Sequence, residues 1–169
     1  MTVRELLAEV EIVAVTGALE ASVRSLRLDS RRVEPGDVFF ALPGVQADGA
    51  RFAAAAIHAG AVAVVGPVGL QVSGATAVEV AEPRLALAQA ANRLHGSPSR
   101  AIQVVAVTGT NGKTTTTYLI ESILAAAAVT SGVIGTTGIR IAGETRPSAF
   151  TTPEAPELQA LLAEMRARG

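Results

Sequence analysis

One short segment carries the residue types of a phosphate-binding loop. Residues 108–115 are Thr-Gly-Thr-Asn-Gly-Lys-Thr-Thr. Two glycines allow the backbone to curl, so that successive N–H groups point inward and form a nest for an anion. A lysine in this position reaches the β- and γ-phosphates of a nucleotide, and the following threonine hydroxyl is a ligand for Mg²⁺. The segment therefore predicts an ATP site built from Gly109, Thr110, Asn111, Gly112, Lys113, Thr114 and Thr115, with Lys113 as the catalytic residue and Thr114 as the metal ligand.

The motif departs from the strict phosphate-loop pattern, which requires a glycine where this chain has Val107. A glycine-rich turn between a strand and a helix, with an incidental lysine, is the alternative interpretation. The sequence context favours the phosphate loop, because an apolar run precedes it and a helical pattern follows it. Lys113 is also the only lysine among the 14 basic residues, and it stands where such a loop needs one.

The elements around the loop indicate a parallel-sheet nucleotide-binding domain. Residues 102–107 form a nearly continuous β-branched run, which predicts a strand buried on both faces of a parallel sheet. A helix is expected over about 113–127 and a strand at 133–134, followed by a ribbon at 138–143. A last helix is expected over about 156–168. A strand, a loop, a helix and a second strand in this order are typical of an open, mostly parallel sheet.

The first hundred residues predict a separate, small mixed α/β domain. Thr2 and Glu5 have the spacing of a capping box at the start of a helix. Short β-rich runs and helical segments then alternate, and the best linker candidate is the Gly-Ser-Pro-Ser stretch at 96–99. We expect a first domain over 1–97 and the beginning of a second over 98–169. Short strands are expected at 12–15, 25–28, 38–42, 61–65 and 76–80, and helices at 51–59 and 83–94.

Composition excludes several classes of protein. Hydrophobic residues make up 49% of the chain, enough for a packed core, and a net charge of −1 gives no reason to expect nucleic acid as a partner. The absence of cysteine excludes thiolate chemistry and a disulfide framework. The acidic N-terminal segment does not have the pattern of a signal peptide, and no apolar run is long enough to cross a membrane. We expect a cytoplasmic protein with no membrane or nucleic-acid partner; its oligomeric state is not readable.

The phosphate loop and its neighbours resemble the Mur peptide ligases and their folate-polyglutamate relatives. The compact Thr-Gly-Thr-Asn-Gly-Lys-Thr-Thr form after a Val-Val-Ala-Val strand carries this resemblance. The motifs at 28–31, 35–44 and 46–49 resemble the N-terminal UDP-binding domain of two branches of the family. The segments at 132–138 and 151–159 are similar to the branch that adds the third amino acid of the peptide. The resemblance covers essentially all 169 residues.

The resemblance implies an ATP-dependent amide-bond ligase of peptidoglycan precursor synthesis. ATP would phosphorylate the D-Glu carboxylate of UDP-MurNAc-L-Ala-D-Glu, and the amine of a diamino acid would attack the acyl phosphate. By similarity, the uridine end would be held by Leu28, Ser30, Gln46 and Ala47, and the sugar-peptide end by Thr151 and Thr152. Many relatives have histidine where this chain has Val45, which puts a side-chain contact to uridine there in doubt. Without the family, the segments at 29–30 and 46–49 are equally interpretable as a turn or cap and as a loop closing onto a helix, and the segment at 151–153 is better interpreted as the introduction of the last helix.

Part of such an active site is missing from these 169 residues. Family members use a carbamylated lysine to hold a second Mg²⁺, and the only lysine here is committed to phosphate. We therefore expect a fragment that ends inside its second domain and is inactive alone. The alternatives are the dipeptide-adding ligase of the same superfamily, which the segments at 132–138 and 151–159 disfavour, and a non-catalytic nucleotide-binding fragment. Whether the added residue is lysine or diaminopimelate is not encoded here.

Overall fold

The computed structural model describes residues 1–44, 48–147 and 152–169. The chain divides into two compact units, Met1–Leu94 and His95–Gly169. The mixed α/β class with a mostly parallel sheet is confirmed. Within the described ranges, no helix combines the length and apolar content that a membrane span requires.

The first unit is built on a five-stranded sheet with the order β1-β5-β4-β3-β2. Only β1 runs antiparallel to its neighbour; the remaining pairs are parallel, as expected where helices connect successive strands. The register is set by pairs such as Phe39 with Val64 and Val64 with Ala77. The strands are β1 (Ile12–Thr16), β2 (Leu26–Arg27), β3 (Val38–Phe40), β4 (Ala63–Gly66) and β5 (Thr76–Val80).

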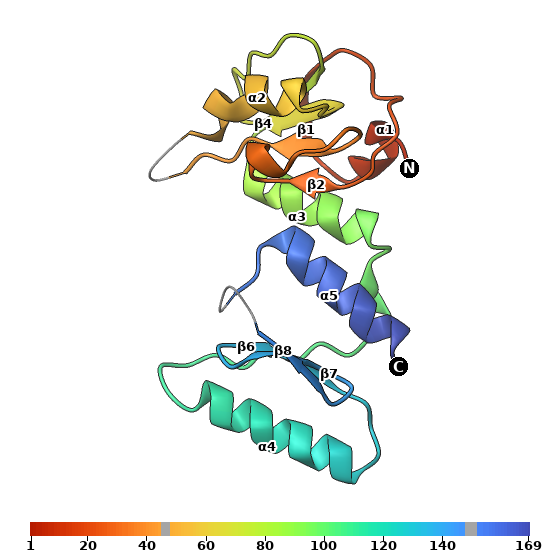
Figure 1. Ribbon diagram of the computed structural model, residues 1–169, viewed down its shortest axis with the longest axis vertical. Coiled ribbons are helices and arrows are strands. Elements are labelled where there is room, and N and C mark those ends of the chain that lie inside the picture. The colour runs from red at the N-terminus through yellow and green to blue at the C-terminus, as the bar shows by residue number, and fades with distance from the viewer. Residues whose placement is uncertain (45–47, 148–151) are drawn as a thin grey trace. The chain divides into compact units, whose positions relative to one another are not determined.

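Helices cover both faces of this sheet (Figure 1). The helices of the unit are α1 (Val3–Leu6), α2 (Ala53–His58) and α3 (Pro83–Leu94), with 3₁₀ turns η1 (Ser30–Arg32) and η2 (Gly49–Phe52). Side chains alternate between the two faces of a strand. Phe39 accordingly packs in the cluster with α2, whereas its neighbours Val38 and Phe40 are buried on the opposite face. Continuous burial of β3 and β4 follows from this double covering.

The second unit contains two longer helices and a small antiparallel sheet. Its elements are η3 (Pro98–Arg100), α4 (Lys113–Ala126), β6 (Gly132–Gly135), β7 (Gly138–Ile141), β8 (Glu144–Arg146) and α5 (Ala155–Ala167). The sheet order is β6-β7-β8, and α4 and α5 lie on opposite sides of it (Figure 1). Arg146 fastens β8 to α5 through two hydrogen bonds to Glu164, of 2.9 and 2.6 Å.

The predicted strand at 102–107 is wrong in this structure. The segment forms no strand, and Val104 and Val105 are 56% and 66% exposed. A parallel strand needs a hydrogen-bonded neighbour, and the described strands of this unit pair only with one another. The expected helix at 113–127 forms as α4, but none of its residues is buried. The apolar pattern of 102–107 and of α4 therefore predicts burial, but the described residues of this unit do not cover these two segments.

Candidate functional site

The phosphate loop has the backbone shape that its glycines predict. Gly109 and Gly112 adopt φ values of +146° and +81°, which L side chains rarely adopt. Gly112 then caps α4, with no side chain bonded to the first helical amides and no acid in the first turn. The positive end of a 14-residue helix is thus presented to the loop without a competing carboxylate from its own first turn.

The side chain of Lys113, the first residue of α4, turns back toward the loop that precedes the helix. Its Nζ donates hydrogen bonds to the carbonyl oxygens of Gly109 and of Thr110, the second at 3.4 Å. An ammonium held by backbone carbonyls of the loop already lies beside the amide nest. Both acceptors are neutral oxygens, and a charged phosphate oxygen would accept a stronger hydrogen bond from the same ammonium.

A pocket of about 220 Å³ joins the phosphate loop to the sheet of the second unit. Its lining comes from the start of α4, from β6, from the β6–β7 turn and from the segment before α5. Five of the lining residues are threonines, and Lys113 supplies the charge. The lining residues are Val107, Lys113, Thr114, Thr117, Val133, Ile134, Gly135, Thr136, Thr137 and Thr152. This donor set suits an oxygen-rich anion.

The same pocket fits a Mg²⁺ ion that is held mainly by nucleotide. The described residues contain no group of three or more His, Cys, Asp or Glu side chains able to hold a metal. Thr114 Oγ1 lies 3.2 Å from Thr136 Oγ1, so one of these hydroxyls donates to the other. Mg²⁺ usually keeps several waters and takes few protein ligands beside phosphate oxygens, and the Thr114 hydroxyl is an oxygen of the kind that Mg²⁺ accepts.

The β6–β7 turn depends on a glycine that no other residue can replace without movement. Gly138 has φ +109°, and a Cβ built there would lie 2.5 Å from the carbonyl oxygen of Arg146. The β7–β8 turn offers a comparison, since Gly143 has φ +84° with no atom within 4 Å of such a Cβ. A side chain substituted at either position would be strained by the positive φ, but only at position 138 would it also clash with another part of the chain.

Gly138→Ala is therefore expected to disturb the pocket more than Gly143→Ala. The matched Gly143→Ala variant isolates the cost of positive φ, about 1 kcal/mol. Gly138→Ala adds the displacement of β8 from β7 and is expected to cost at least about twice as much. Denaturant unfolding of residues 1–169, followed by the fluorescence of Tyr118, the only tyrosine among them, measures both. Equal destabilisation by the two substitutions would contradict the steric argument.

Thr152 is placed at the pocket by the start of α5. The helix begins at Ala155 with Pro156 in its first turn, a position that proline favours. At the other side of β6, Gly132 accommodates Met165 of α5, since a Cβ there would lie 2.6 Å from the methionine sulfur. The predicted sugar-peptide residue Thr152 is thus brought to the pocket of Lys113 and Thr114. Thr151 lies outside the described residues.

Two of the predicted uridine residues, Leu28 and Ser30, lie beyond the carboxyl end of the parallel strand β2. Leu28 follows β2 and Ser30 opens η1; both are half-buried. The segment after β3 is closed by a bridge between Pro43 and Asp48, and Gly49 N–H donates to Leu42 at 3.0 Å. Ligands of open α/β sheets bind at such edges. Gln46 and Ala47, with Val45, lie outside the described residues.

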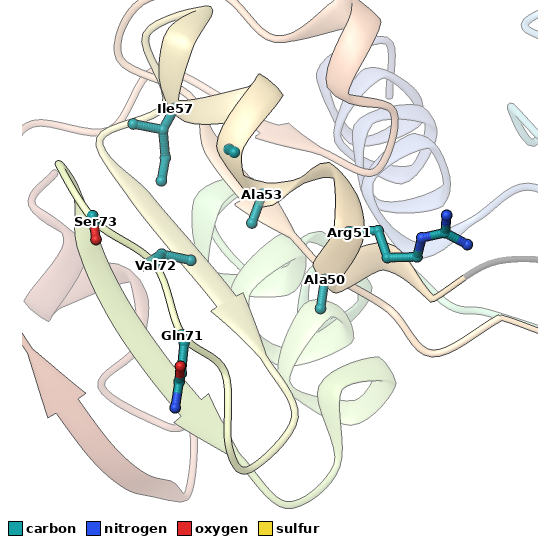
Figure 2. Close-up of a pocket in the computed structure, with 8 residues that line it drawn as sticks. Ala50, Arg51, Ala53, Ile57, Gln71, Val72 and Ser73 are labelled. Atoms are coloured by element: carbon teal, nitrogen blue, oxygen red, sulfur yellow. The ribbon is translucent and has the colours of Figure 1, made fainter.

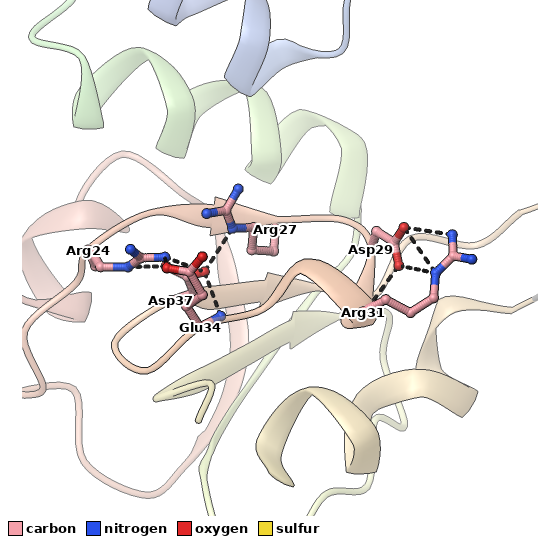
Figure 3. Close-up of polar contacts among 6 residues, drawn as sticks. All are labelled: Arg24, Arg27, Asp29, Arg31, Glu34 and Asp37. Atoms are coloured by element: carbon pink, nitrogen blue, oxygen red, sulfur yellow. Dashed lines mark hydrogen bonds and ion pairs between the residues drawn. The ribbon is translucent and has the colours of Figure 1, made fainter. Parts of the chain in front are cut away.

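Two carboxylates hold this edge in shape (Figure 3). Asp29 accepts from the backbone amide of Arg31 at 3.0 Å and pairs with the Arg31 guanidinium at 2.7 Å. The Arg31 side chain and amide lower the pKa of Asp29 to about 2. Asp37 is fully buried and accepts from Arg27 at 2.8 Å, from Arg24 at 3.1 Å and from the Glu34 amide at 3.0 Å. It ties β2 to the turn before β3.

A larger hollow of about 590 Å³ lies in the first unit, between α2 and the loop before β5 (Figure 2). Its floor is alanine and valine, with Gln71 and Ser73 as polar lining groups, and Arg51 points away from the other labelled side chains. None of the predicted site residues that the structure describes lines it. Arg51 is the only charged residue among the described lining residues.

Sequence reasoning missed four polar residues around the phosphate pocket. Thr117, Thr136 and Thr137 line it, and Arg140 donates to Thr137 at 3.1 Å. Thr117 has a detectable signal, because it lies one helical turn after Thr114. The others come from a β-hairpin that only the fold brings to the loop. Arg140 has no sequence signal at all, since arginines are ordinarily exposed.

Comparison with known families agrees with the geometry. Residues 22–107 match the model described as Mur ligase family, catalytic domain, and residues 107–169 match the Mur ligase middle domain. The first match covers half of the chain, so the chain belongs to the Mur ligase family.

The similar relatives share one activity in their names. UDP-N-acetylmuramoyl-L-alanyl-D-glutamate--2,6-diaminopimelate ligase of Geobacter sulfurreducens is 40% identical over 98% of this chain and 33% of its own length. The ligase of the same name from Streptomyces avermitilis is 44% identical over 92% of this chain and 31% of its own length. The chain thus spans about a third of the length of these relatives.

Solved structures show the same relationship. A structure of a ligase of the same name superposes with a TM-score of 0.73 at 30% identity, covering 100% of this chain and 34% of that one. MurF ligase from Thermotoga maritima in complex with ADP gives a TM-score of 0.50 at 33% identity, over 62% of this chain and 24% of that one.

Proposed function

We propose that this chain supplies the UDP-sugar and phosphate-binding parts of a ligase that joins a diamino acid to UDP-MurNAc-L-Ala-D-Glu. The pocket that unites Lys113, Thr114 and Thr152 carries the proposal. A phosphate-binding cation and a hydroxyl predicted for the sugar-peptide end meet in one site, as transfer of phosphate to a carboxylate requires. The names of the relatives support this substrate and make diaminopimelate the first candidate for the amine.

The reaction divides into two balanced steps. A carboxylate oxygen of D-Glu attacks the γ-phosphorus of ATP, the bond to the β-phosphate oxygen breaks, and ADP leaves. The amine nitrogen then attacks the acyl carbon, the bond from that carbon to the bridging oxygen breaks, inorganic phosphate departs with the bridging oxygen, and the nitrogen loses one proton. Lys113, the loop amides and the start of α4 stabilise the charge of the transferring group. Mg²⁺, with Thr114 as its ligand, supplies further neutralisation when bound.

The first and second units divide the substrate between them in this proposal. We assign Leu28, Ser30, Gln46 and Ala47 to the uridine end, and Thr151 with Thr152 to the sugar-peptide end. The carboxyl edge of the first sheet supports the former, and the threonine-rich pocket supports the latter. The domain boundary near residue 97 is supported by the division of the chain after Leu94. We place the protein in the cytoplasm, where ATP is available.

The assay is amide formation by the full-length protein that contains these 169 residues. With ATP, Mg²⁺, UDP-MurNAc-L-Ala-D-Glu and diaminopimelate, we expect equal amounts of ADP and a UDP-tripeptide, measured by mass spectrometry. Omission of the diamino acid should stop product formation, and hydroxylamine should then trap the acyl phosphate as a hydroxamate.

Two other outcomes would replace the proposal. Consumption of D-alanyl-D-alanine with a UDP-tripeptide acceptor would identify the dipeptide-adding ligase. Nucleotide binding without turnover of either acceptor would identify a nucleotide-binding module. Residues 1–169 alone are expected to release no phosphate above background, because they span only about a third of the length of the ligases that they resemble.

A further inference from the structure

Arg140 of β7 is a buried cation beside the phosphate pocket. Its side chain is 9% exposed, and its Nε donates to Glu121 of α4 at 2.8 Å. Nη1 donates to Thr137 Oγ1 at 3.1 Å, and the guanidinium carbon lies 4.0 Å from the centre of the Tyr118 ring. Nη2 is buried with no hydrogen-bond partner among the described residues. Burial of a charge costs free energy unless the charge is paired and hydrogen-bonded, so we ask what the contacts of Arg140 accomplish in this position.

The contacts connect the two walls of the pocket. Glu121 lies on α4, the helix that begins at Lys113, whereas Thr137 lies in the turn between β6 and β7. Arg140 therefore bridges the helix of the phosphate loop to the turn that faces the loop. The turn also approaches the loop directly, because Thr136 and Thr114 hydroxyls lie 3.2 Å apart.

The hydrogen bond from Arg140 favours a donor role for the Thr137 hydroxyl. A threonine hydroxyl has one hydrogen to donate and two lone pairs to accept. One lone pair of Thr137 is occupied by a guanidinium that can only donate. Thr137 also lines the pocket, so its hydrogen is available to an acceptor there. A hydroxyl polarised by a cation donates best to a negatively charged oxygen.

We propose that Thr137 donates a hydrogen bond to an anionic oxygen of the reacting groups, and that Arg140 is the positioning residue that orients it. The proposal rests on the proposed function and adds two residues to it. The oxygen belongs to the transferring phosphoryl group or to the acceptor carboxylate, both of which present the same chemistry to the pocket. Glu121 of α4 balances the charge of Arg140 and holds its guanidinium against this helix.

The test compares paired variants of the full-length protein. Thr137→Val removes the hydroxyl while keeping the shape, and Thr137→Ser keeps the hydroxyl. We expect Thr137→Val to lower kcat about ten- to hundredfold, and Thr137→Ser to stay within about threefold of wild type. A raised KM for ATP assigns the oxygen to the phosphoryl group, and a raised KM for the UDP-dipeptide assigns it to the carboxylate.

Arg140→Met is then combined with Thr137→Val. Because Arg140 acts through Thr137, the double variant should be no slower than Thr137→Val alone. Additive losses of kcat in the double variant would overturn the proposal. Wild-type kcat and KM values in Thr137→Val would also overturn it, and Arg140 would then have only a structural role in connecting α4 to the β6–β7 hairpin. Thr137→Val retains the Arg140–Glu121 pair, so it remains informative if Arg140→Met fails to fold.

Failure of the proposed function is distinguishable from failure of this inference. A wild-type protein that forms no amide would refute the ligase assignment. Affinities for ADP and for a non-hydrolysable ATP analogue are then measured for wild type and Thr137→Val. The affinity for UDP-MurNAc-L-Ala-D-Glu is measured in the same two proteins. If both the preference for the analogue over ADP and the affinity for the UDP-dipeptide are unchanged in Thr137→Val, the inference is overturned in that case; a loss of either supports it.

Discussion

Lys113→Met is expected to lower kcat/KM for ATP by about 10³-fold or more in the full-length protein. The Lys113 ammonium lies against the backbone of the glycine-containing loop at the start of α4. Its positive charge would there attract the negatively charged β- and γ-phosphates. Lys113 is the only lysine of the chain, and no other cationic side chain lines the pocket among the described residues. Steady-state kinetics with ATP as the varied substrate measure the loss.

Two controls separate the charge of Lys113 from its shape. Lys113→Arg keeps the charge but replaces a compact point charge by a planar fork, so it should recover little of the activity. Arg100→Met removes a cation elsewhere in the second unit, where the side chain is exposed, and should change kcat/KM less than twofold. A Lys113→Met enzyme that retains a tenth of wild-type kcat/KM would refute the catalytic assignment.

Local sequence signals predicted much of the fold correctly. The capping box forms with both of its hydrogen bonds, Thr2 N–H to Glu5 at 2.8 Å and Glu5 N–H to Thr2 at 3.2 Å. Pro83 opens a helix that ends at Leu94, as its pattern indicates. These features depend on residues three or four positions apart, so the necessary information lies within one short window.

Features that depend on distant partners were not predictable in the same way. The β-branched run at 102–107 has the composition of a buried strand, yet a strand exists only where another strand pairs with it. The Thr136–Thr137 turn reaches the phosphate loop only through the path of the β6–β7 hairpin. Arg140 becomes buried because Glu121 and Thr137 accept its hydrogen bonds, and neither is adjacent to it in a recognisable motif.

The candidate site likewise has features that single residues predict and contacts that only the fold creates. The sequence alone predicts that Gly109 and Gly112 allow the loop to curl, because tolerance of positive φ is a property of single glycine residues. The meeting of Thr152 with Lys113 required the structure, since 39 positions of chain separate them. The predicted contacts at Gln46, Ala47 and Thr151 lie outside the described residues and stay predictions.

Asp37→Asn is expected to destabilise the first unit by about 2–4 kcal/mol. The carboxylate is fully buried, and it accepts hydrogen bonds from Arg24, Arg27 and the Glu34 amide (Figure 3). An asparagine amide has one oxygen where the carboxylate has two, and it presents two hydrogens toward donors. Glu34→Gln is the matched control, because Glu34 contacts the same Arg24 from an exposed position and should cost under about 0.5 kcal/mol.

The dependence on pH distinguishes the charge of Asp37 from its shape. Burial alone raises the pKa of Asp37, but the hydrogen bonds from Arg27, Arg24 and the Glu34 amide outweigh it, and the pKa lies below its ordinary value. A lowered folded-state pKa contributes stability above the unfolded value, about 3.9, and that stability is lost as the pH falls through the folded value. The difference between wild type and Asp37→Asn should therefore be full at neutral pH and shrink below about pH 4.

Hydrogen exchange of the β2 and β3 amides is the suitable measurement, because the only tyrosine lies in the second unit and fluorescence does not report on the first. Faster exchange in Asp37→Asn, confined to residues 1–94, is the expected result. Since Arg27 precedes Leu28 directly, loosening of β2 should also weaken binding of UDP, measured by calorimetry. Unchanged exchange in β2 and β3 would show that the arginines find other partners, and that this buried carboxylate does not hold the edge where the uridine end is expected.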